Sequence, residues 1–326
     1  IGRAQMEGGS GGTILRYDPD TGWAKYVQGS LVPDGEVVLI FNWVADSGVF
    51  VTGNTGSGEA AADACFAALA DARVVAGDGV TPLAGWESFN FLDDQRHLHF
   101  IGHSRGAVIS SASVQRIGGV LNREVEHVTS LDPFPWNPAN DPFPTTWSHV
   151  VWADNYFQDL ALPLFNPASF PLDGAWDFEL SGILSGNGCE SFPHNDVPLW
   201  YLGTIDLAFA PCPPDVNRDD WYPAGNEHGY WYSDLVCDHV SERPATTGSA
   251  ADPPATPAII NGDFESGPWA GWRYHGGYLD EEIMTGEVSP VFFDALKGSQ
   301  VLVLGGLYDG WAQHNRFFLT QNYQFC

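Results

Sequence analysis

A pentapeptide between a predicted strand and a predicted helix constrains the fold of this chain more than any other feature. The pentapeptide is Gly102-His-Ser-Arg-Gly106, and it follows a short run, 97–101, that predicts a strand. The small and apolar residues after it predict a helix that ends near the glycine pair 118–119. Because glycine has no Cβ, the two glycines let chain segments pass close together around an exposed serine at a sharp turn. The same pattern recurs at residues 8–12, but there no strand is predicted before it and no helix after it.

Strands and helices are predicted to alternate up to residue 153. The predicted elements are a hairpin within 13–32, strands at 37–41, 97–101, 125–131 and 148–153, and helices at 59–72 and 105–119. This alternation predicts an α/β fold with a mostly parallel central sheet and helices on its faces. The stretch 155–193 loses the pattern and is rich in Phe, Leu, Trp, Pro and Gly, so we expect an irregular lid or binding loop there.

The composition excludes several classes of protein. The chain has 326 residues, of which 44% are hydrophobic, so it is long and apolar enough for one large core and a second small domain. Its formal net charge of −28 repels phosphate backbones and anionic headgroups, so no nucleic-acid partner is expected. No apolar stretch is long enough for a transmembrane segment. The acidic composition suits a secreted protein, and we expect one or both ends of the sequence to be incomplete.

Three segments carry a resemblance to a known family. Phe100-Ile-Gly-His-Ser-Arg-Gly-Ala107 resembles the nucleophile elbow of α/β-hydrolase lipases. Val128-Thr-Ser-Leu-Asp-Pro133 resembles the strand-end segment (T/S)-G-L-D-P of pancreatic-lipase-like lipases and phospholipases A1, and Ile40-Phe-Asn-Trp43 resembles their V-D-W strand. The resemblance covers roughly residues 36–205. It implies an α/β-hydrolase fold with Ser104 as nucleophile, and a serine hydrolase that cleaves carboxylic esters through an acyl-enzyme, as lipases and carboxylesterases do.

Two aspartates compete for the acid of a Ser–His–Asp triad. Asp132 follows the predicted strand 125–131, the strand directly after the serine, and Asp154 ends the next predicted strand, 148–153. Many α/β-hydrolases take the acid from the later position, whereas the lipases that this chain resembles take it from the earlier one, within Leu-Asp-Pro. The resemblance therefore implies Asp132 as the acid and leaves Asp154 as the alternative acid. For Asp154, a carboxylate that caps a loop is the competing interpretation.

His194 is the predicted base. In α/β-hydrolases the histidine follows both the serine and the acid along the chain. His194 lies just before a predicted aromatic-rich helix, and it resembles the loop histidine of hydrolases of this type. His228 is the reserve, and His103 is interpreted as a packing residue of the turn. The backbone N–H of Arg105 is predicted to donate to the oxyanion. The second donor in the family comes from an upstream His-Gly loop, but no histidine precedes His97 here.

The C-terminal part is predicted to be a separate module. The three expected parts are an α/β-hydrolase catalytic domain over 1–243, a linker over 244–257, and a partial β-sandwich over 258–326. The segment Ile260-Asn-Gly-Asp-Phe-Glu-Ser-Gly267 resembles the opening strand of carbohydrate-binding-module-like sandwiches, which implies a polysaccharide as partner. In those modules this strand often helps hold a structural calcium ion, which would fall here on Asn261, Asp263 and Glu265. A plain strand without a ligand is the alternative.

Two other functions remain open beside the lipase or carboxylesterase. One is a carbohydrate esterase that the C-terminal module tethers to a polysaccharide, and the other is a catalytically silent binding protein with the same fold. No cofactor is predicted for the ester hydrolysis. The five cysteines lack CxxC spacing, which argues against a zinc ribbon or a redox pair, and one disulfide among Cys189, Cys212 and Cys237 remains open.

Overall fold

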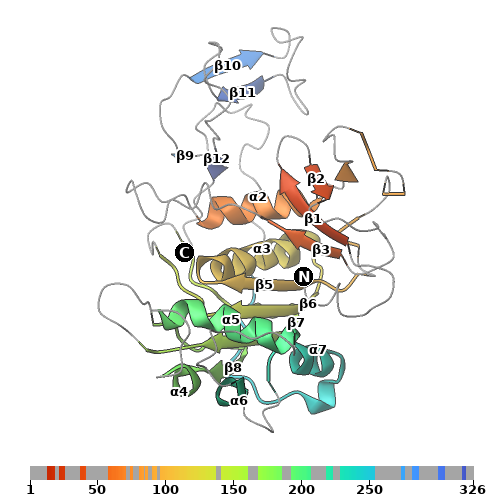
Figure 1. Cartoon of the computed structure of the whole chain (residues 1–326). Coiled ribbons are helices and arrows are strands. Elements are labelled where there is room, and N and C mark those ends of the chain that lie inside the picture. The colour runs from red at the N-terminus through yellow and green to blue at the C-terminus, as the bar shows by residue number, and fades with distance from the viewer. Residues whose placement is uncertain are drawn as a thin grey trace. The chain divides into compact units, whose positions relative to one another are not determined.

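A sheet of four parallel strands carries the residues singled out by the sequence (Figure 1). Its strands, in spatial order, are β5 (His99–His103), β6 (Val125–Leu131), β7 (Val150–Phe157) and β8 (Trp176–Glu179). In the register of this sheet His103 pairs with Leu131, and Leu131 pairs with Tyr156. The carboxyl ends of the strands therefore meet at one edge, where ligands bind in open α/β sheets. The chain thus has the predicted α/β fold with a parallel sheet.

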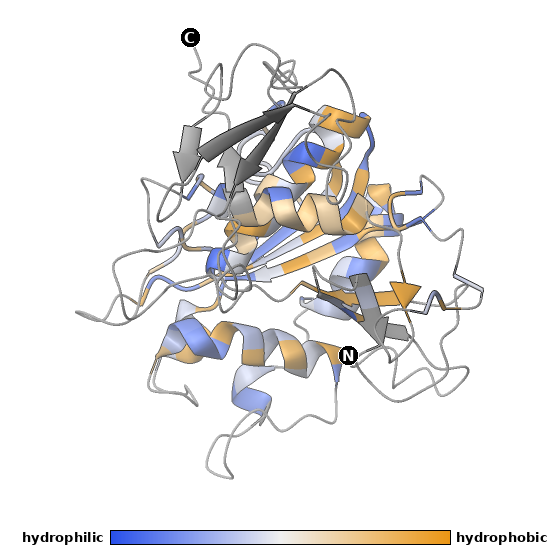
Figure 2. Cartoon of the chain, turned by 90° about the horizontal axis from the view of Figure 1, so that it is seen from above, coloured by the Kyte–Doolittle hydropathy of each residue, from blue (hydrophilic) through white to orange (hydrophobic). Residues whose placement is uncertain are grey.

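Helices lie on both faces of this sheet because its strands alternate their side chains between two buried environments. One face packs against helix α3 (Arg105–Leu121), which in turn packs against α2 (Gly58–Ala70). On that side Val128 of β6 belongs to the same core cluster as Ile109 of α3. The other face packs against α5 (Pro193–Ile205) and α7 (Tyr230–Asp238). Figure 2 shows hydrophobic residues along these strands and helices, with hydrophilic ones among them.

The first part of the chain forms a second sheet with the strand order β3-β1-β2-β4. Its strands are β1 (Thr13–Asp18), β2 (Gly22–Lys25), β3 (Val37–Ile40) and β4 (Val74–Val75). Strands β1 and β2 pair antiparallel, which confirms the predicted hairpin, whereas β3 pairs parallel with β1. Trp23 of β2 is buried, and its indole N–H donates to the carbonyl of Ala68 at 2.8 Å. This bond ties the second sheet to α2.

The chain divides into two units, Ile1–Pro253 and Pro254–Cys326. In the first unit the computed structural model describes residues 13–18, 22–25, 37–41, 58–70, 74–75, 81–83, 85–86, 90–93, 96–136, 141–160, 168–185, 192–206, 218–222 and 228–253. In the second unit it describes 273–275, 281–285, 300–304 and 318–320. The short helical elements of the first unit are α4 (Ser181–Leu184), α6 (Arg218–Trp221) and the 3-10 helix η1 (Val240–Glu242).

The second unit contains two antiparallel strand pairs among its described residues. Strand β10 (Glu281–Thr285) pairs with β11 (Gln300–Leu304), and β9 (Arg273–His275) pairs with β12 (Phe318–Thr320). Antiparallel pairing is what a β-sandwich is built from, and the sandwich itself stays a prediction. The predicted calcium ligands Asn261, Asp263 and Glu265 lie outside the described residues.

Two predicted element ends are wrong for identifiable reasons. Helix α3 does not end at the glycine pair 118–119 but continues to Leu121, and Asn122 ends it in the left-handed conformation with φ 52°. Gly118 is needed inside the helix because a Cβ there would collide with the imidazole ring of His149. Strand β7 does not end before Asp154 but runs to Phe157. It continues because Tyr156 still pairs with Leu131 of β6 and Phe157 still pairs with Glu179 of β8.

Two predicted irregular segments contain ordered structure. The stretch 155–193 includes β8, which pairs with β7, and the short helix α4. The predicted linker 244–257 begins on the first unit, because Thr247 exchanges backbone hydrogen bonds with residues 174 and 175. Ala251 likewise bonds to residues 146 and 148. The Pro and Gly content correctly indicates irregular backbone, but these hydrogen bonds hold residues 247 and 251 against the rest of the first unit.

Candidate active site

Ser104 lies at the turn between β5 and α3 in a strained backbone conformation. Its φ is 57° and its ψ is −126°, which is rare for a residue with a side chain and costs on the order of 1–3 kcal/mol. Three backbone hydrogen bonds hold it there. Its N–H donates to the carbonyl of Leu131 at 2.9 Å, and its carbonyl accepts from Ala107 at 3.1 Å and from Phe134 at 3.3 Å. Such strain concentrates at functional sites, where the surrounding structure fixes one side chain in place.

The two glycines of the pentapeptide have different roles. A Cβ at Gly102 would lie 2.5 Å from the carbonyl oxygen of Gly106 and 2.6 Å from the Cα of Ala107. Only glycine therefore lets α3 turn back so closely onto β5. A Cβ at Gly106, in contrast, would meet no atom within 4 Å. The close approach explains the first glycine, and the space above Gly106 stays open beside the serine.

Asp132 and His194 form a direct hydrogen bond although they lie 62 positions apart in the sequence. Asp132 follows the last residue of β6, is fully buried, and has a positive φ of 47°. Its Oδ2 accepts from His194 Nδ1 at 2.5 Å. Because a carboxylate only accepts, Nδ1 carries the proton, and the proton-accepting role in acyl transfer then belongs to Nε2. The structure thus brings together the predicted acid and the predicted base.

His194 lies inside the first turn of α5 rather than in the loop before it. Pro193 occupies the first helical position, where its missing N–H costs nothing. The ring of His103, the residue before Ser104, packs against the ring of His194 with centroids 4.6 Å apart. His103 Nε2–H donates to the backbone carbonyl of His194 at 2.9 Å. Residue 194 is therefore tied both to the carboxylate of Asp132 and to the neighbour of the serine.

His103 remains neutral in this position. Burial is the main cause that lowers its pKa from 6.5 to about 4; the positive charge that His194 can carry acts in the same direction, and the bond to the carbonyl opposes both. A neutral imidazole can donate from Nε2 without a second charge next to His194. His103 therefore supports His194 by a hydrogen bond, which agrees with its interpretation as a packing residue.

Gln158 holds the carboxylate of Asp132 from the other side. It follows the last residue of β7 and is fully buried. Its backbone N–H donates to Oδ1 of Asp132 at 3.0 Å, and its side-chain Nε2 donates to Oδ2 at 2.9 Å. Its own Oε1 accepts from the N–H of Leu160 at 2.8 Å, which fixes the orientation of the amide. Gln158 was not predicted as a site residue. Its position as a polar residue directly after a buried strand is the sequence feature that could have indicated this role.

Arg105 contributes its backbone to the turn and its side chain to the core. Its N–H belongs to the first residue of α3, where helix N–H groups favour a developing anion. The side chain is buried, and its Nε and Nη2 bind Asp141 at 2.6–3.0 Å. Asp141 also accepts from the N–H of Gly58 at the start of α2, at 3.0 Å. The guanidinium is thus engaged in holding α2 and α3 together.

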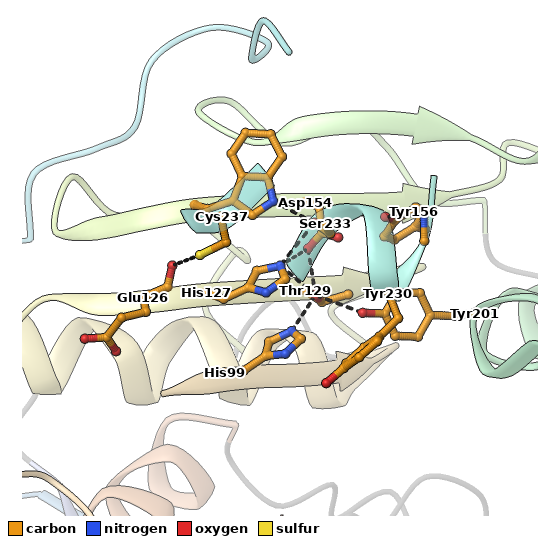
Figure 3. Close-up of polar contacts among 12 residues, drawn as sticks. His99, Glu126, His127, Thr129, Asp154, Tyr156, Tyr201, Tyr230, Ser233 and Cys237 are labelled. Atoms are coloured by element: carbon orange, nitrogen blue, oxygen red, sulfur yellow. Dashed lines mark hydrogen bonds and ion pairs between the residues drawn. The ribbon is translucent and has the colours of Figure 1, made fainter. Parts of the chain in front are cut away.

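Asp154, the alternative acid, belongs to a different cluster in the middle of the sheet (Figure 3). Its Oδ1 accepts from Thr129 Oγ1 at 2.6 Å and from His127 Nε2 at 3.0 Å. Thr129 in turn accepts from His99 Nε2 at 2.8 Å, and the rings of His99 and His127 stack with centroids 3.8 Å apart. Because β7 extends three residues beyond Asp154, this carboxylate does not lie at the edge of the sheet where Ser104 lies.

Two further side chains close the cluster around Asp154. Tyr201 of α5 lies 3.4 Å from Thr129 Oγ1, and burial raises the pKa of Tyr201 well above its usual value, so the phenol stays neutral. Ser233 of α7 lies 3.3 Å from His127 Nε2 and accepts from the indole of Trp152 at 2.6 Å. All these groups except His99 are buried, so the cluster joins sheet and helices rather than opening to a ligand.

The remaining predicted residues lie apart from the serine. The ring of His228, the reserve base, packs against Phe178 of β8 with centroids 3.7 Å apart. Cys237 is a buried free thiol that donates to the carbonyl of Glu126, and burial raises its pKa to about 11. Cys189 and Cys212 lie outside the described residues.

The described part of the chain contains neither a cluster of metal-binding side chains nor a helix suited to crossing a membrane. There, no group of three or more His, Cys, Asp and Glu side chains could hold a metal ion. Over the same residues, none of the helices combines the length and apolar character needed to cross a bilayer.

No protein-family model, curated protein or solved structure matches this chain. Any proposal about its function therefore depends on the chemistry of its own residues.

Proposed function

We propose that this chain is a serine hydrolase that cleaves carboxylic esters through an acyl-enzyme. The observation that carries the proposal is the hydrogen bond from His194 Nδ1 to Asp132 Oδ2, made beside the strained turn of Ser104. The backbone of Ser104 bonds to Leu131, the residue before Asp132. A carboxylate that orients an imidazole next to a serine at a sharp turn is the arrangement that activates a hydroxyl for acyl transfer.

The order of the parts supports an α/β-hydrolase fold within this proposal. The serine follows β5, the acid follows the adjacent parallel strand β6, and the histidine comes later in the chain, which is the order Ser…Asp…His of that fold. The strained serine at the start of a helix agrees with a nucleophile elbow.

In the proposed mechanism each residue has one task. His194 Nε2 takes the proton of Ser104 as Oγ attacks the ester carbonyl, and Asp132 stabilises the imidazolium. The N–H of Arg105 donates to the oxyanion. When the intermediate collapses, the bond to the alcohol oxygen breaks and His194 returns the proton to the leaving alcohol. Water then repeats these steps on the acyl-enzyme and releases the acid.

Exposed aromatic side chains support an apolar acyl group and hence a lipase or carboxylesterase. Trp136 hydrogen-bonds to Ser104 Oγ, and its side chain is 37% exposed. Phe192, two residues before the base, is also 37% exposed. Aromatic surface left in water at a reactive hydroxyl favours substrates that cover it with hydrocarbon.

Labelling with a fluorophosphonate tests the proposal. The intact protein should gain one covalent adduct, located on Ser104 by peptide mass spectrometry, and Ser104→Ala should gain none. Ser10→Ala is the matched control, since Ser10 is the centre of the other Gly-x-Ser-x-Gly pattern and its loss should leave the adduct in place. An unlabelled wild-type protein would favour a silent binding protein. Rates on p-nitrophenyl acetate and on long-chain esters then separate an esterase from a lipase.

A further inference from the structure

The proposed acyl transfer places negative charge on the carbonyl oxygen of the substrate, and two donors normally meet that charge. The backbone N–H of Arg105 is one of them. A second donor has a role only if the proposed function holds.

The loop after β6 brings an indole N–H to the nucleophile. Trp136 follows Asp132 by four residues, and its Nε1–H donates to Ser104 Oγ over an N···O distance of 3.3 Å. The same loop is anchored a second time, because the N–H of Phe134 donates to the carbonyl of Ser104 at 3.3 Å. The ring of Phe134 packs edge-on against Trp136, with centroids 5.4 Å apart and an interplanar angle of 77°. Backbone and side-chain contacts therefore position the indole against the serine.

We infer that the indole N–H of Trp136 is the second donor of the oxyanion hole. When Ser104 Oγ bonds to the carbonyl carbon, the π electron pair of the carbonyl moves onto its oxygen and the serine proton moves to His194 Nε2. The oxyanion is then bonded to the same carbon as Oγ, so a donor that already reaches Oγ needs only a small ring movement to reach the oxyanion. Collapse of the intermediate re-forms the carbonyl, breaks the carbon–alcohol bond and returns the proton from His194 to the alcohol.

The length of the resting hydrogen bond agrees with this role. An N···O distance of 3.3 Å is long for a donor to a neutral hydroxyl, whose bonds cluster near ~2.9 Å. An oxyanion is a stronger acceptor than a hydroxyl, and bonds to charged acceptors are shorter and about twice as strong. The indole N–H would therefore bond more strongly to the oxyanion than it does to the resting hydroxyl. A bond that becomes strong only as the charge develops lowers the barrier rather than tightening the binding of substrate.

The competing role for Trp136 is that of a wall for the acyl group. A wall needs only the aromatic ring, whereas an oxyanion donor needs the N–H. Trp136→Phe separates the two, because it keeps an aromatic ring at an exposed position and removes the N–H. As an oxyanion donor, Trp136 predicts a kcat lowered by about 10²-fold with KM changed less than about 3-fold, the size of effect found for single oxyanion donors.

The experiment compares wild type, Trp136→Phe and a control on p-nitrophenyl acetate. The control is Trp147→Phe, because the indole of Trp147 donates at 2.8 Å to the carbonyl of Ser111 on α3 rather than to the serine. The control should keep the wild-type kcat. A trifluoromethyl ketone, which forms an oxyanion on the serine, should bind Trp136→Phe more weakly by about the same factor as the loss of kcat/KM.

Each outcome has one meaning. An unchanged kcat in Trp136→Phe, or a higher KM alone, would overturn the inference and leave the hydrolase proposal intact, provided that wild type and variant both take up the fluorophosphonate. A wild-type protein that is neither labelled nor active would overturn both. A loss of kcat with unchanged KM and weaker ketone binding, beside a normal control, supports Trp136 as an oxyanion donor.

Discussion

Replacing Asp132 by asparagine should abolish turnover because of how the carboxylate is hydrogen-bonded. Both of its oxygens accept: Oδ1 from the backbone of Gln158, and Oδ2 from the side chain of Gln158 and from His194 Nδ1. An asparagine places an NH₂ group where one oxygen was. Keeping the bond from the Gln158 backbone leaves that NH₂ group facing His194 Nδ1. The imidazole must then accept at Nδ1 and carry its proton on Nε2, where it can no longer take the serine proton.

The size of the effect follows from the loss of the working tautomer. In serine hydrolases the same substitution lowers kcat by about 10⁴-fold, which is about 5–6 kcal/mol of barrier. The placement that turns the NH₂ group toward His194 also breaks the bond from Gln158 Nε2, whose amide is fixed by Leu160 and cannot turn without losing that second bond. Leaving such a buried donor unsatisfied costs about 1–3 kcal/mol of unfolding free energy. We therefore expect a folded, slightly less stable and nearly inactive variant.

The matched control is Asp154→Asn, which changes the other buried carboxylate of the sheet. Its partners are Thr129 and His127, so the substitution should lower stability by about 1–3 kcal/mol and leave kcat within about 3-fold of wild type. Both variants are compared by kcat/KM on p-nitrophenyl acetate and by chemical unfolding. If Asp154→Asn abolished turnover while Asp132→Asn kept at least a tenth of it, the assignment of the acid would be wrong.

Three further perturbations address the turn, the carboxylate and the pH dependence. Gly102→Ala should lower the unfolding free energy by about 1–3 kcal/mol because its Cβ meets the backbone of α3, whereas Gly106→Ala should leave it within about 1 kcal/mol of wild type in urea titrations. Gln158→Leu should lower kcat by about 10-fold, since it removes the side-chain donor that orients the carboxylate of Asp132; an unchanged kcat would contradict this. The pKa of His103 is lowered from 6.5 to about 4, so the unfolded chain binds a proton at this residue at a higher pH than the folded chain does. His103 should therefore contribute a loss of about 3 kcal/mol to the free energy of unfolding between pH 6.5 and 4, and His103→Asn should flatten the dependence of that free energy on pH.

The sequence predicted the elements that depend on local pattern. The strand β6 has the predicted bounds, because Asp132-Pro133 directly after Leu131 ends it. The strained turn at Ser104 was also predicted, because the glycines of the pentapeptide indicate a sharp turn. In the structure Gly102 is required by the close approach of α3 to β5. In both cases the cause lies within a few neighbouring residues.

Three features that depend on distant partners were not predicted from the sequence. Asp154 looks like the end of a strand, but Thr129 and His127 on the neighbouring strand donate to Oδ1 of its carboxylate inside the sheet, and β7 continues to Phe157. The bonds of Gln158 to Asp132 and of Trp136 to Ser104 join residues 26 and 32 positions apart. No pattern in the sequence around Gln158 or Trp136 indicates the bonding partner, so these two contacts are found only in the folded structure.

Among the residues that the structure describes, two Asp–His pairs lie at this sheet, and their geometry distinguishes the pair that fits the proposed reaction. In the cluster around Asp154, the carboxylate and the hydroxyl of Ser233 both lie against Nε2 of the same histidine, His127. The carboxylate holds the proton on one imidazole nitrogen so that the other nitrogen can take the proton of the nucleophile, and an acid and a nucleophile must therefore face opposite nitrogens. At the edge of the sheet Asp132 occupies Nδ1 of His194, which assigns proton transfer to Nε2. The interior pair therefore joins the sheet to the helices, and the edge pair leaves Nε2 of His194 for the proton transfer that we propose.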